Sequence, residues 1–277
     1  MNLIDTHSHL YDEAFDPDRE EALERAREAG VGRLLLPAID STSHERLFEL
    51  CRRHPEYCTP MMGLHPTSVN DIPDWKRELQ LVEHYLETPP EGIGRFCAVG
   101  EIGLDLYWSR DFRKEQIEVF ARQIELSLQY GLPIAVHTRD AWPETLDLIR
   151  SFRGRGVKGV FHAFSDGLET YRALKECGDF LFGIGGVVTF KKSRIAEVVR
   201  DMEPCDLVLE TDCPYLTPAP HRGRRNESAY VRYICEKVAE LKGLSPEEVA
   251  RTTTANAERM FGHNEDSQTE SCLHDRI

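Results

Sequence analysis

Histidines and carboxylates recur in this sequence directly after short apolar runs. The first run leads into Asp5-Thr6-His7-Ser8-His9, and later runs lead into Glu101, His137, His162 and Glu210-Thr211-Asp212. Neutral imidazole and carboxylate groups are the ligands that Zn²⁺, Mn²⁺ and similar ions take in proteins. These residue types therefore predict divalent-metal chemistry.

The candidate ligands outnumber what one catalytic ion with open coordination positions needs. They are His7, His9, Glu101, His137, His162 and Asp212. Two ions about 3.5–4 Å apart, bridged by a carboxylate, match this inventory better. Such a pair clamps a phosphoryl group and lowers the pKa of a bridging water, so the residues favour phosphodiester hydrolysis.

Each of these residues has a structural explanation when it is taken alone. A lone HxH pair is weak evidence, and a lone His137 or His162 is more often a hydrogen-bonded interior histidine. The combination is different, because burying so many ionisable groups without a metal would carry a large desolvation cost. We therefore prefer the metal site.

The elements that must position these residues alternate between short apolar runs and longer amphipathic stretches. The expected strands are residues 3–5, 33–37, 59–63, 96–100, 133–137, 159–162, 180–184 and 207–210. Helical patterns between them include 18–29, 43–53, 114–130, 143–152, 169–176 and 193–202, and two more follow at 227–242 and 245–261. Eight strands separated by helices predict an α/β fold, a (β/α)₈ TIM-type barrel with extra C-terminal helices. Catalytic residues of such barrels lie at the C-terminal ends of the strands, where these side chains are expected.

The sequence shows no linker and no internal repeat, so we expect one hydrolase barrel over residues 1–262. Residues 263–277 form a polar, aperiodic tail that we expect to be disordered. No apolar run is long enough for a membrane span, and the N-terminus lacks the pattern of a signal peptide. The eight cysteines are scattered, as in a reduced protein. We expect a cytoplasmic enzyme with no membrane association and no obligate protein partner.

The net charge of −14 argues against a surface that holds DNA by electrostatics alone. The arginines Arg222, Arg224 and Arg225 form the one short basic segment that could contact phosphates. Among the other histidines, His44, His54 and His84 fall in polar helical stretches and are expected to face solvent. His65 lies just past the third strand, where a phosphate contact and a structural role are both open.

Seven segments resemble the TatD family of metal-dependent DNases, within the wider amidohydrolase-like metallohydrolases. They are DTHSHL at 5–10, GLHP at 63–66, GEIGLD at 100–105, VHTRDA at 136–141, HAFS at 162–165, ETDCPYLTP at 210–218 and RGRRNE at 222–227. These segments follow one another in order across residues 3–261, so the resemblance covers nearly the whole chain. Two positions depart from the family pattern: Asp166 stands where glycine is usual, and Ser228 where proline is usual. Both departures bear on substrate preference more than on metal binding.

The resemblance implies a barrel that hydrolyses phosphodiester bonds in DNA with two divalent ions (Mg²⁺, Mn²⁺ or Zn²⁺), often as a 3′-exonuclease. Its substrate would be a single strand or a 3′ end. One ion would be held by His7, His9, Glu101 and Asp212, and the other by Glu101, His137 and His162, with Glu101 as the bridge.

Further roles follow from the chemistry of the neighbouring residues. Asp212 is a candidate proton acceptor for the attacking water, alongside Glu101 as a catalytic group. Glu210 is expected to orient a ligand or a water. Arg224 and Arg225 are candidate phosphate contacts, because a guanidinium fork matches phosphate oxygens.

Two other functions stay open on the sequence alone. The same metal pair in an amidohydrolase or deacylase would polarise the carbonyl of a C–N or carboxylic-ester bond. A catalytically silent scaffold or nucleic-acid-binding module would be expected to lack one of the ligands, and none is missing.

Overall fold

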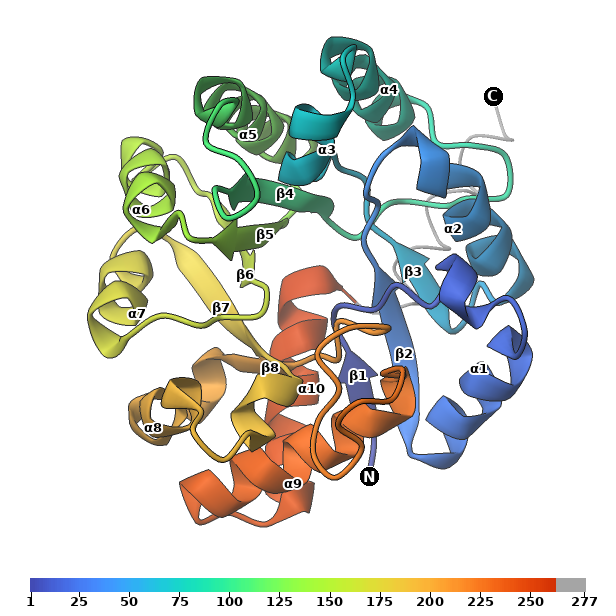
Figure 1. The fold of residues 1–277 in the computed structure, drawn as a ribbon, viewed down its shortest axis with the longest axis vertical. Coiled ribbons are helices and arrows are strands. Elements are labelled where there is room, and N and C mark those ends of the chain that lie inside the picture. Colours follow the sequence, from blue (N-terminus) through green and yellow to red (C-terminus); the bar gives the residue numbers. More distant parts are fainter. Residues whose placement is uncertain (263–277) are drawn as a thin grey trace, which may run out of the picture.

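Eight parallel strands surround the centre of the molecule in a computed structural model that describes residues 1–262 (Figure 1). The strands are β1 Leu3–Asp5, β2 Val31–Leu36, β3 Cys58–Pro60, β4 Val99–Asp105, β5 Ile134–Arg139, β6 Lys158–Phe161, β7 Asp179–Ile184 and β8 Leu207–Leu209. They pair in chain order within two ladders, β1 to β3 and β4 to β8.

Backbone hydrogen bonds join the two ladders into a closed barrel. The amide of Gly100 donates to the carbonyl of Met62 at 3.0 Å, which connects the β3 and β4 segments. On the other side the amide of Thr6 donates to the carbonyl of Leu209 at 3.0 Å. The expected (β/α)₈ barrel is therefore confirmed.

The helices lie outside the strands, most of them in a ring around the barrel (Figure 1). They are α1 Arg19–Glu28, α2 Ser41–Arg53, α3 Pro66–Asp71, α4 Trp75–Glu87, α5 Arg113–Tyr130, α6 Trp142–Ser151, α7 Leu168–Lys175, α8 Arg194–Asp201, α9 Val231–Lys242 and α10 Pro246–Phe261. Helix α10 begins with the expected capping box, in which the side chains of Ser245 and Glu248 exchange hydrogen bonds with each other's backbone amides.

A separate apolar cluster fills the barrel interior. It takes a buried side chain from each strand or from its flank, together with three from the end of α10. Its members are Ile4, Leu35, Met61, Cys97, Ala98, Ala135, Val160, Leu181, Val208, Ala257, Met260 and Phe261. Helix α10 thus closes one end of the barrel, so that a site can open only at the other.

The fourth strand corrects the boundary expected from the sequence. It runs from Val99 to Asp105, so Glu101 lies inside the strand and not at its end. Gly100 and Gly103 are turn-type residues, which argued for an earlier stop. In the structure Gly103 has φ 141°, and a Cβ there would lie 1.9 Å from the carbonyl oxygen of His137. These glycines let β4 approach β5 closely.

Of the two helices between β3 and β4, only a helical stretch around His84 was expected, and the packing of α4 changes the environment of one histidine. His44 is 4% exposed, in place of the solvent-facing position expected for it. Its ring lies 5.5 Å from that of Tyr85 on α4 and 5.7 Å from that of Phe48. His84 is exposed as expected.

Several expectations concern chain segments away from the barrel mouth. The polar tail predicted at residues 263–277 lies outside the described residues. Within the described part, no helix combines the length and apolar character that crossing a bilayer requires. The seven cysteines of this part are all free thiols.

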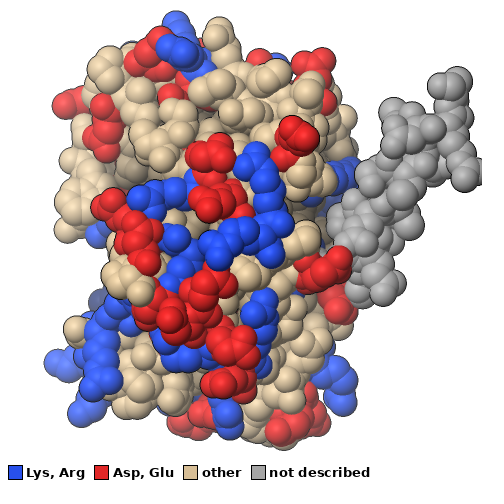
Figure 2. Space-filling model, turned by 90° about the vertical axis from the view of Figure 1, so that its right-hand side faces the viewer, with Lys and Arg blue, Asp and Glu red and all other residues tan. Residues whose placement is uncertain are grey.

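Charged side chains of both signs interleave on the face formed around α1 and α2, and no continuous basic stripe crosses it (Figure 2). The arginines there are neutralised locally. Arg46 and Arg19 both contact Asp16, at 2.7 and 2.5 Å, and Arg53 contacts Glu20 at 2.7 Å. This face therefore offers little net attraction for a polyanion.

Candidate metal centre

A pocket of about 830 Å³ opens at the C-terminal ends of the strands. Its wall carries most of the histidines and acids that the sequence analysis singled out. Those lining it are His9, His65, Glu101, His137, His162, Glu210 and Asp212; Asp105 lines it as well, and His7 lies directly behind them. The convergence expected from five separate strand ends is present in the structure.

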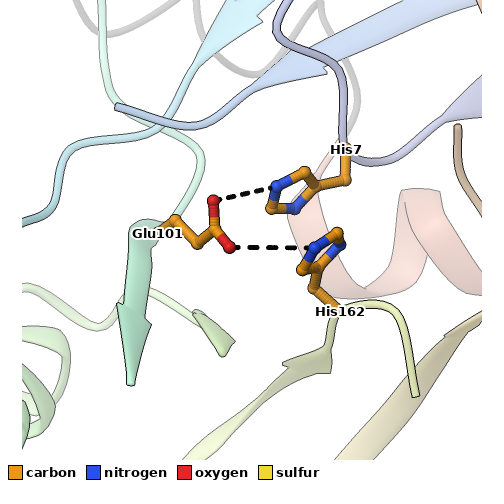
Figure 3. A group of neighbouring side chains, drawn as sticks. All are labelled: His7, Glu101 and His162. Carbon is orange, nitrogen blue, oxygen red and sulfur yellow. Dashed lines mark hydrogen bonds and ion pairs between the residues drawn. The ribbon is translucent and has the colours of Figure 1, made fainter. Parts of the chain in front are cut away.

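Glu101 stands at the centre of this group, and its two carboxylate oxygens face different histidines. Oε2 lies 3.1 Å from Nε2 of His7 and 3.6 Å from Nε2 of His9. Oε1 lies 3.0 Å from Nδ1 of His137 and 3.7 Å from Nε2 of His162. Figure 3 shows the carboxylate facing the rings of His7 and His162, with one oxygen toward each, and the two rings stack with centroids 3.5 Å apart.

Asp212 reaches the same group from the turn after β8. It has a positive φ of 56°, unusual for a residue with a side chain, and its Oδ1 lies 3.5 Å from Nε2 of His9. Asp5, which is fully buried, fixes this turn by accepting hydrogen bonds from the amide and hydroxyl of Thr211 at 2.9 and 2.6 Å. The ends of β1 and β8 are thereby held together.

The donor atoms fit divalent ions. Three groups of ligand-type atoms lie within 4.8 Å of one another: His7, His9 and Asp212; His7, Glu101 and His162; and His65, Glu101 and His137. Imidazole nitrogens mixed with carboxylate oxygens are a donor set for Zn²⁺ or Mn²⁺. The first group joins three of the four residues expected to share one ion.

Polar contacts on the far side of two histidine rings set which ring nitrogen faces the pocket. The hydroxyl of Tyr11 donates to the carbonyl of Pro37 at 2.6 Å, so it accepts from Nδ1 of His9 at 2.9 Å. Nδ1 of His162 lies 2.9 Å from Oε1 of Glu210. In both rings Nε2 is the nitrogen that faces the acids and could bind a metal ion.

His65 lies at the edge of this group and combines two contacts. Its Nε2 is 3.5 Å from Oε1 of Glu101. Its Nδ1 accepts a hydrogen bond from the amide of Thr67 at 3.2 Å, which caps the start of α3. A neutral ring that accepts at Nδ1 carries its proton on Nε2, so His65 presents an N–H donor to the pocket.

Asp105 belongs to the centre, although the sequence analysis gave it no role. Its Oδ2 lies 3.0 Å from Nε2 of His137, whose other nitrogen faces Glu101. Residues 101, 103 and 105 share one face of β4, because side chains alternate along a strand. A predicted fourth strand that continued to residue 105 would have pointed to Asp105 as a residue of the site.

The charges of the centre stabilise one another. Burial alone would raise the pKa of Glu101, but His7 and His65 hold it well below its usual value. Burial alone would lower the pKa of His162, whereas Glu210 and Asp212 raise it to about 10. Burial and the neighbouring His162 lower the pKa of His7. Acids and histidines here form one coupled electrostatic unit.

The arginines expected to contact phosphate do not line the pocket. Arg225 is a correction: its guanidinium forms paired contacts of 2.6 and 2.8 Å with Asp18 and lies 4.2 Å from the centre of the Phe15 ring. Both terminal nitrogens of its guanidinium group therefore contact Asp18, an acid far away in sequence, and not a phosphate. Arg224 is exposed, and its phosphate role remains a prediction.

Comparison with known proteins agrees with these motifs. The family model described as TatD related DNase matches residues 4–262. "Uncharacterized metal-dependent hydrolase YabD" of Bacillus subtilis is 36% identical over 95% of this chain and 100% of its own length. "Putative deoxyribonuclease TATDN3" of mouse is 32% identical over 94% of this chain and 88% of its own.

A solved structure shows the same architecture. The TatD homologue YJJV of Escherichia coli superposes with a TM-score of 0.84 at 28% identity, covering 94% of this chain and 97% of that one. Given the near-complete family match and relatives above 30% identity, the chain belongs to the TatD family.

Proposed function

We propose that this protein is a metal-dependent hydrolase that cleaves phosphodiester bonds in DNA, acting from the 3′ end with two divalent ions. Mg²⁺, Mn²⁺ and Zn²⁺ are the candidate ions. The family and the names of its relatives support the general class, and the placement of the ligand-type residues around Glu101 supports a site for two ions.

One observation carries the proposal most directly: the two oxygens of Glu101 face separate sets of histidines. A carboxylate in this position suits a bridge between two ions. His7, His9 and Asp212 would hold one ion on the Oε2 side. His137 and His162 would hold the other on the Oε1 side.

Bound ions would lower the pKa of a water and neutralise charge on the phosphoryl oxygens. The protein supplies the remaining groups. Burial alone would raise the pKa of Asp212, but His162 and His9 lower it, so this carboxylate is ionised at neutral pH and can accept a proton. The Nε2–H of His65 can donate to a phosphate oxygen. Glu210 orients the ring of His162, and Tyr11 orients the ring of His9.

The test is digestion of a 5′-labelled single strand and of its duplex, with Mg²⁺, Mn²⁺ and Zn²⁺ compared. A 3′-exonuclease gives a ladder of progressively shorter labelled products, whereas an endonuclease gives internal fragments from the first time point. The Glu101→Gln variant is the matched control. We expect it to lose activity together with bound metal, with its fold retained by circular dichroism.

The amidohydrolase alternative is tested in the same assay with a p-nitroanilide and a p-nitrophenyl ester. Turnover of these substrates without cleavage of either DNA would replace the proposal by a deacylase. Full metal content and near-normal cleavage in Glu101→Gln would remove the bridging role.

A further inference from the structure

Large apolar side chains are exposed at two loops that flank the pocket. Of the six in the described residues, five lie in these loops. Tyr107, Trp108 and Phe112 follow β4, and Tyr215 and Leu216 follow β8. Trp108 is 68% exposed and Tyr215 is 57% exposed, and both line the pocket. Because β4 and β8 lie on opposite sides of the barrel, the two loops lie at opposite rims of the pocket (Figure 1).

The first rim is an ordered unit. The rings of Tyr107 and Trp108 meet edge to face with centroids 4.9 Å apart. The guanidinium carbon of Arg139 lies 3.8 Å from the ring centre of Tyr107 and 5.3 Å from that of Trp108. The amide of Tyr107 donates to Asp105 Oδ1 at 3.0 Å, so this rim is anchored to the metal centre itself.

Arg139 differs from Arg46, Arg53 and Arg225, which contact acids. Within residues 1–262, no acidic side chain lies within ion-pair distance of its guanidinium. It is also the one lysine or arginine among the described residues that line the pocket. An arginine without an acidic partner among the described residues thus lies beside two aromatic rings at the entrance to the candidate metal centre.

We propose that Trp108 and Arg139 form a platform that binds one unpaired nucleotide at the pocket mouth, with Tyr215 and Leu216 on the opposite rim. The base stacks on the indole of Trp108, and Arg139 contacts the adjoining phosphate. This inference rests on the proposed function and deepens it, because it makes an unpaired end the preferred DNA substrate.

The chemistry of the chain favours this occupant. Stacking needs no positive surface, so it suits a protein of net charge −14. A base inside a duplex has both faces covered by its neighbours, and only an unpaired base offers a face to the indole. A protein or lipid partner would require a continuous apolar surface, whereas these two rims are separated by the pocket and its charged floor.

The experiment compares two single strands that carry the same phosphates. One has normal nucleotides throughout, and the other has abasic residues at its last two 3′ positions. Binding is measured by fluorescence anisotropy with EDTA-treated protein, and KM with metal-loaded protein. We expect Trp108→Ala to weaken binding of the normal strand about tenfold or more, a typical effect of losing one base–aromatic stack. The abasic strand should lose much less.

Matched variants separate stacking from general effects. Trp108→Phe keeps an aromatic face and should retain most of the affinity, whereas Trp108→Leu should not. Arg110 and Phe112 are exposed on the same loop but do not line the pocket, so Arg110→Ala and Phe112→Ala should bind as wild type does. Tyr215→Ala tests the opposite rim independently.

The outcomes of these experiments test the nucleotide-binding platform separately from the proposed nuclease activity. Equal losses on both strands, unchanged binding in Trp108→Ala, or no binding of the normal strand by either form of the protein would overturn the platform. Base-dependent binding without any DNA cleavage would leave the platform standing and refute the nuclease. Equal binding of both strands by wild type would point to a protein or lipid as the occupant of this surface.

Discussion

Asp105 and His137 are in direct contact: the carboxylate oxygen Oδ2 lies 3.0 Å from the ring nitrogen Nε2. The other nitrogen of the same ring, Nδ1, lies 3.0 Å from Glu101. His137 is therefore held between two acids. Its orientation depends on Asp105, since no other side chain fixes the Nε2 end in the described residues.

Replacing Asp105 by asparagine should weaken metal binding. The amide keeps the shape of the side chain but removes the charge that orients and polarises the ring. Loss of such a supporting partner costs about 10–100-fold in metal affinity. Titration of the metal-free protein with Zn²⁺ or Mn²⁺ measures this directly. Asp111→Asn, on the exposed part of the same loop, is the control, and an affinity equal to wild type in both variants would contradict the role.

The contact between Asp105 and His137 was not predicted because the sequence of the fourth strand suggests an earlier end. Gly100 and Gly103 interrupt the apolar run, so the strand seemed to end at Gly100. The other ligand-type residues were found because each follows an uninterrupted run, as His137 and His162 do. In parallel barrels such ends converge, and the fold therefore made the centre predictable.

Contacts between residues far apart in sequence could not be predicted from the sequence. Arg225 looked like a phosphate contact because it lies in a basic segment, yet its partner Asp18 is 207 positions away. His44 looked exposed because the sequence does not show that α4 packs over it. Local patterns show which residues can do chemistry, whereas partners brought together by folding decide which of them remain free to do it.

Two of the three histidines near Oε1 of Glu101, His137 and His65, should respond differently to removal. His137→Ala takes away a proposed ligand and should lower the bound metal. His65→Ala removes an N–H donor whose other nitrogen caps α3, so metal content should stay normal while kcat/KM falls about 100-fold, the scale of losing one such donor. Elemental analysis and steady-state kinetics on the same samples separate the effects. Metal loss in His65→Ala would make it a ligand instead.

Arg225 should support stability and not substrate binding. The paired contact with Asp18 is partly exposed, so Arg225→Ala should lower the free energy of unfolding by about 1 kcal/mol, at the upper end for such pairs. Urea unfolding at neutral pH measures the change. Arg224→Ala, an exposed neighbour, is the control and should unfold as wild type does. A large rise in KM for DNA without loss of stability in Arg225→Ala would contradict this assignment.

The same pair predicts an acid dependence. Hydrogen bonds from Arg225 lower the pKa of Asp18 from 3.8 to about 2. A group whose pKa is depressed on folding contributes stability above its unfolded pKa and loses it as the pH falls toward the folded value. The difference in stability between wild type and Asp18→Asn should therefore be full at pH 6, shrink below about pH 4 and be nearly absent at pH 2. A difference that stays constant over this range would show that the contact acts through packing alone.

Binding of DNA should depend only weakly on salt. The net charge is −14, the arginines around α1 and α2 are paired with acids, and Arg139 is the one basic residue among the described residues lining the pocket. Few phosphates can then be neutralised by side chains at once. For a single strand the logarithm of the affinity should fall with the logarithm of the salt concentration by about 0.7 per contacted phosphate, with about two or three contacts in all.

Two arginine variants test how much of the salt dependence of DNA binding comes from Arg139. Arg139→Ala should reduce it by about 0.7, because one phosphate contact is lost, whereas Arg110→Ala should leave it unchanged. Anisotropy titrations across a series of salt concentrations, with each variant on the same strand, provide the slopes. A slope that corresponds to six or more contacts would require a continuous basic surface, and the face in Figure 2 carries acids between its arginines instead. Weak salt dependence together with strong dependence on Trp108 would mean that stacking and bound metal, more than surface charge, hold the polyanion on this acidic protein.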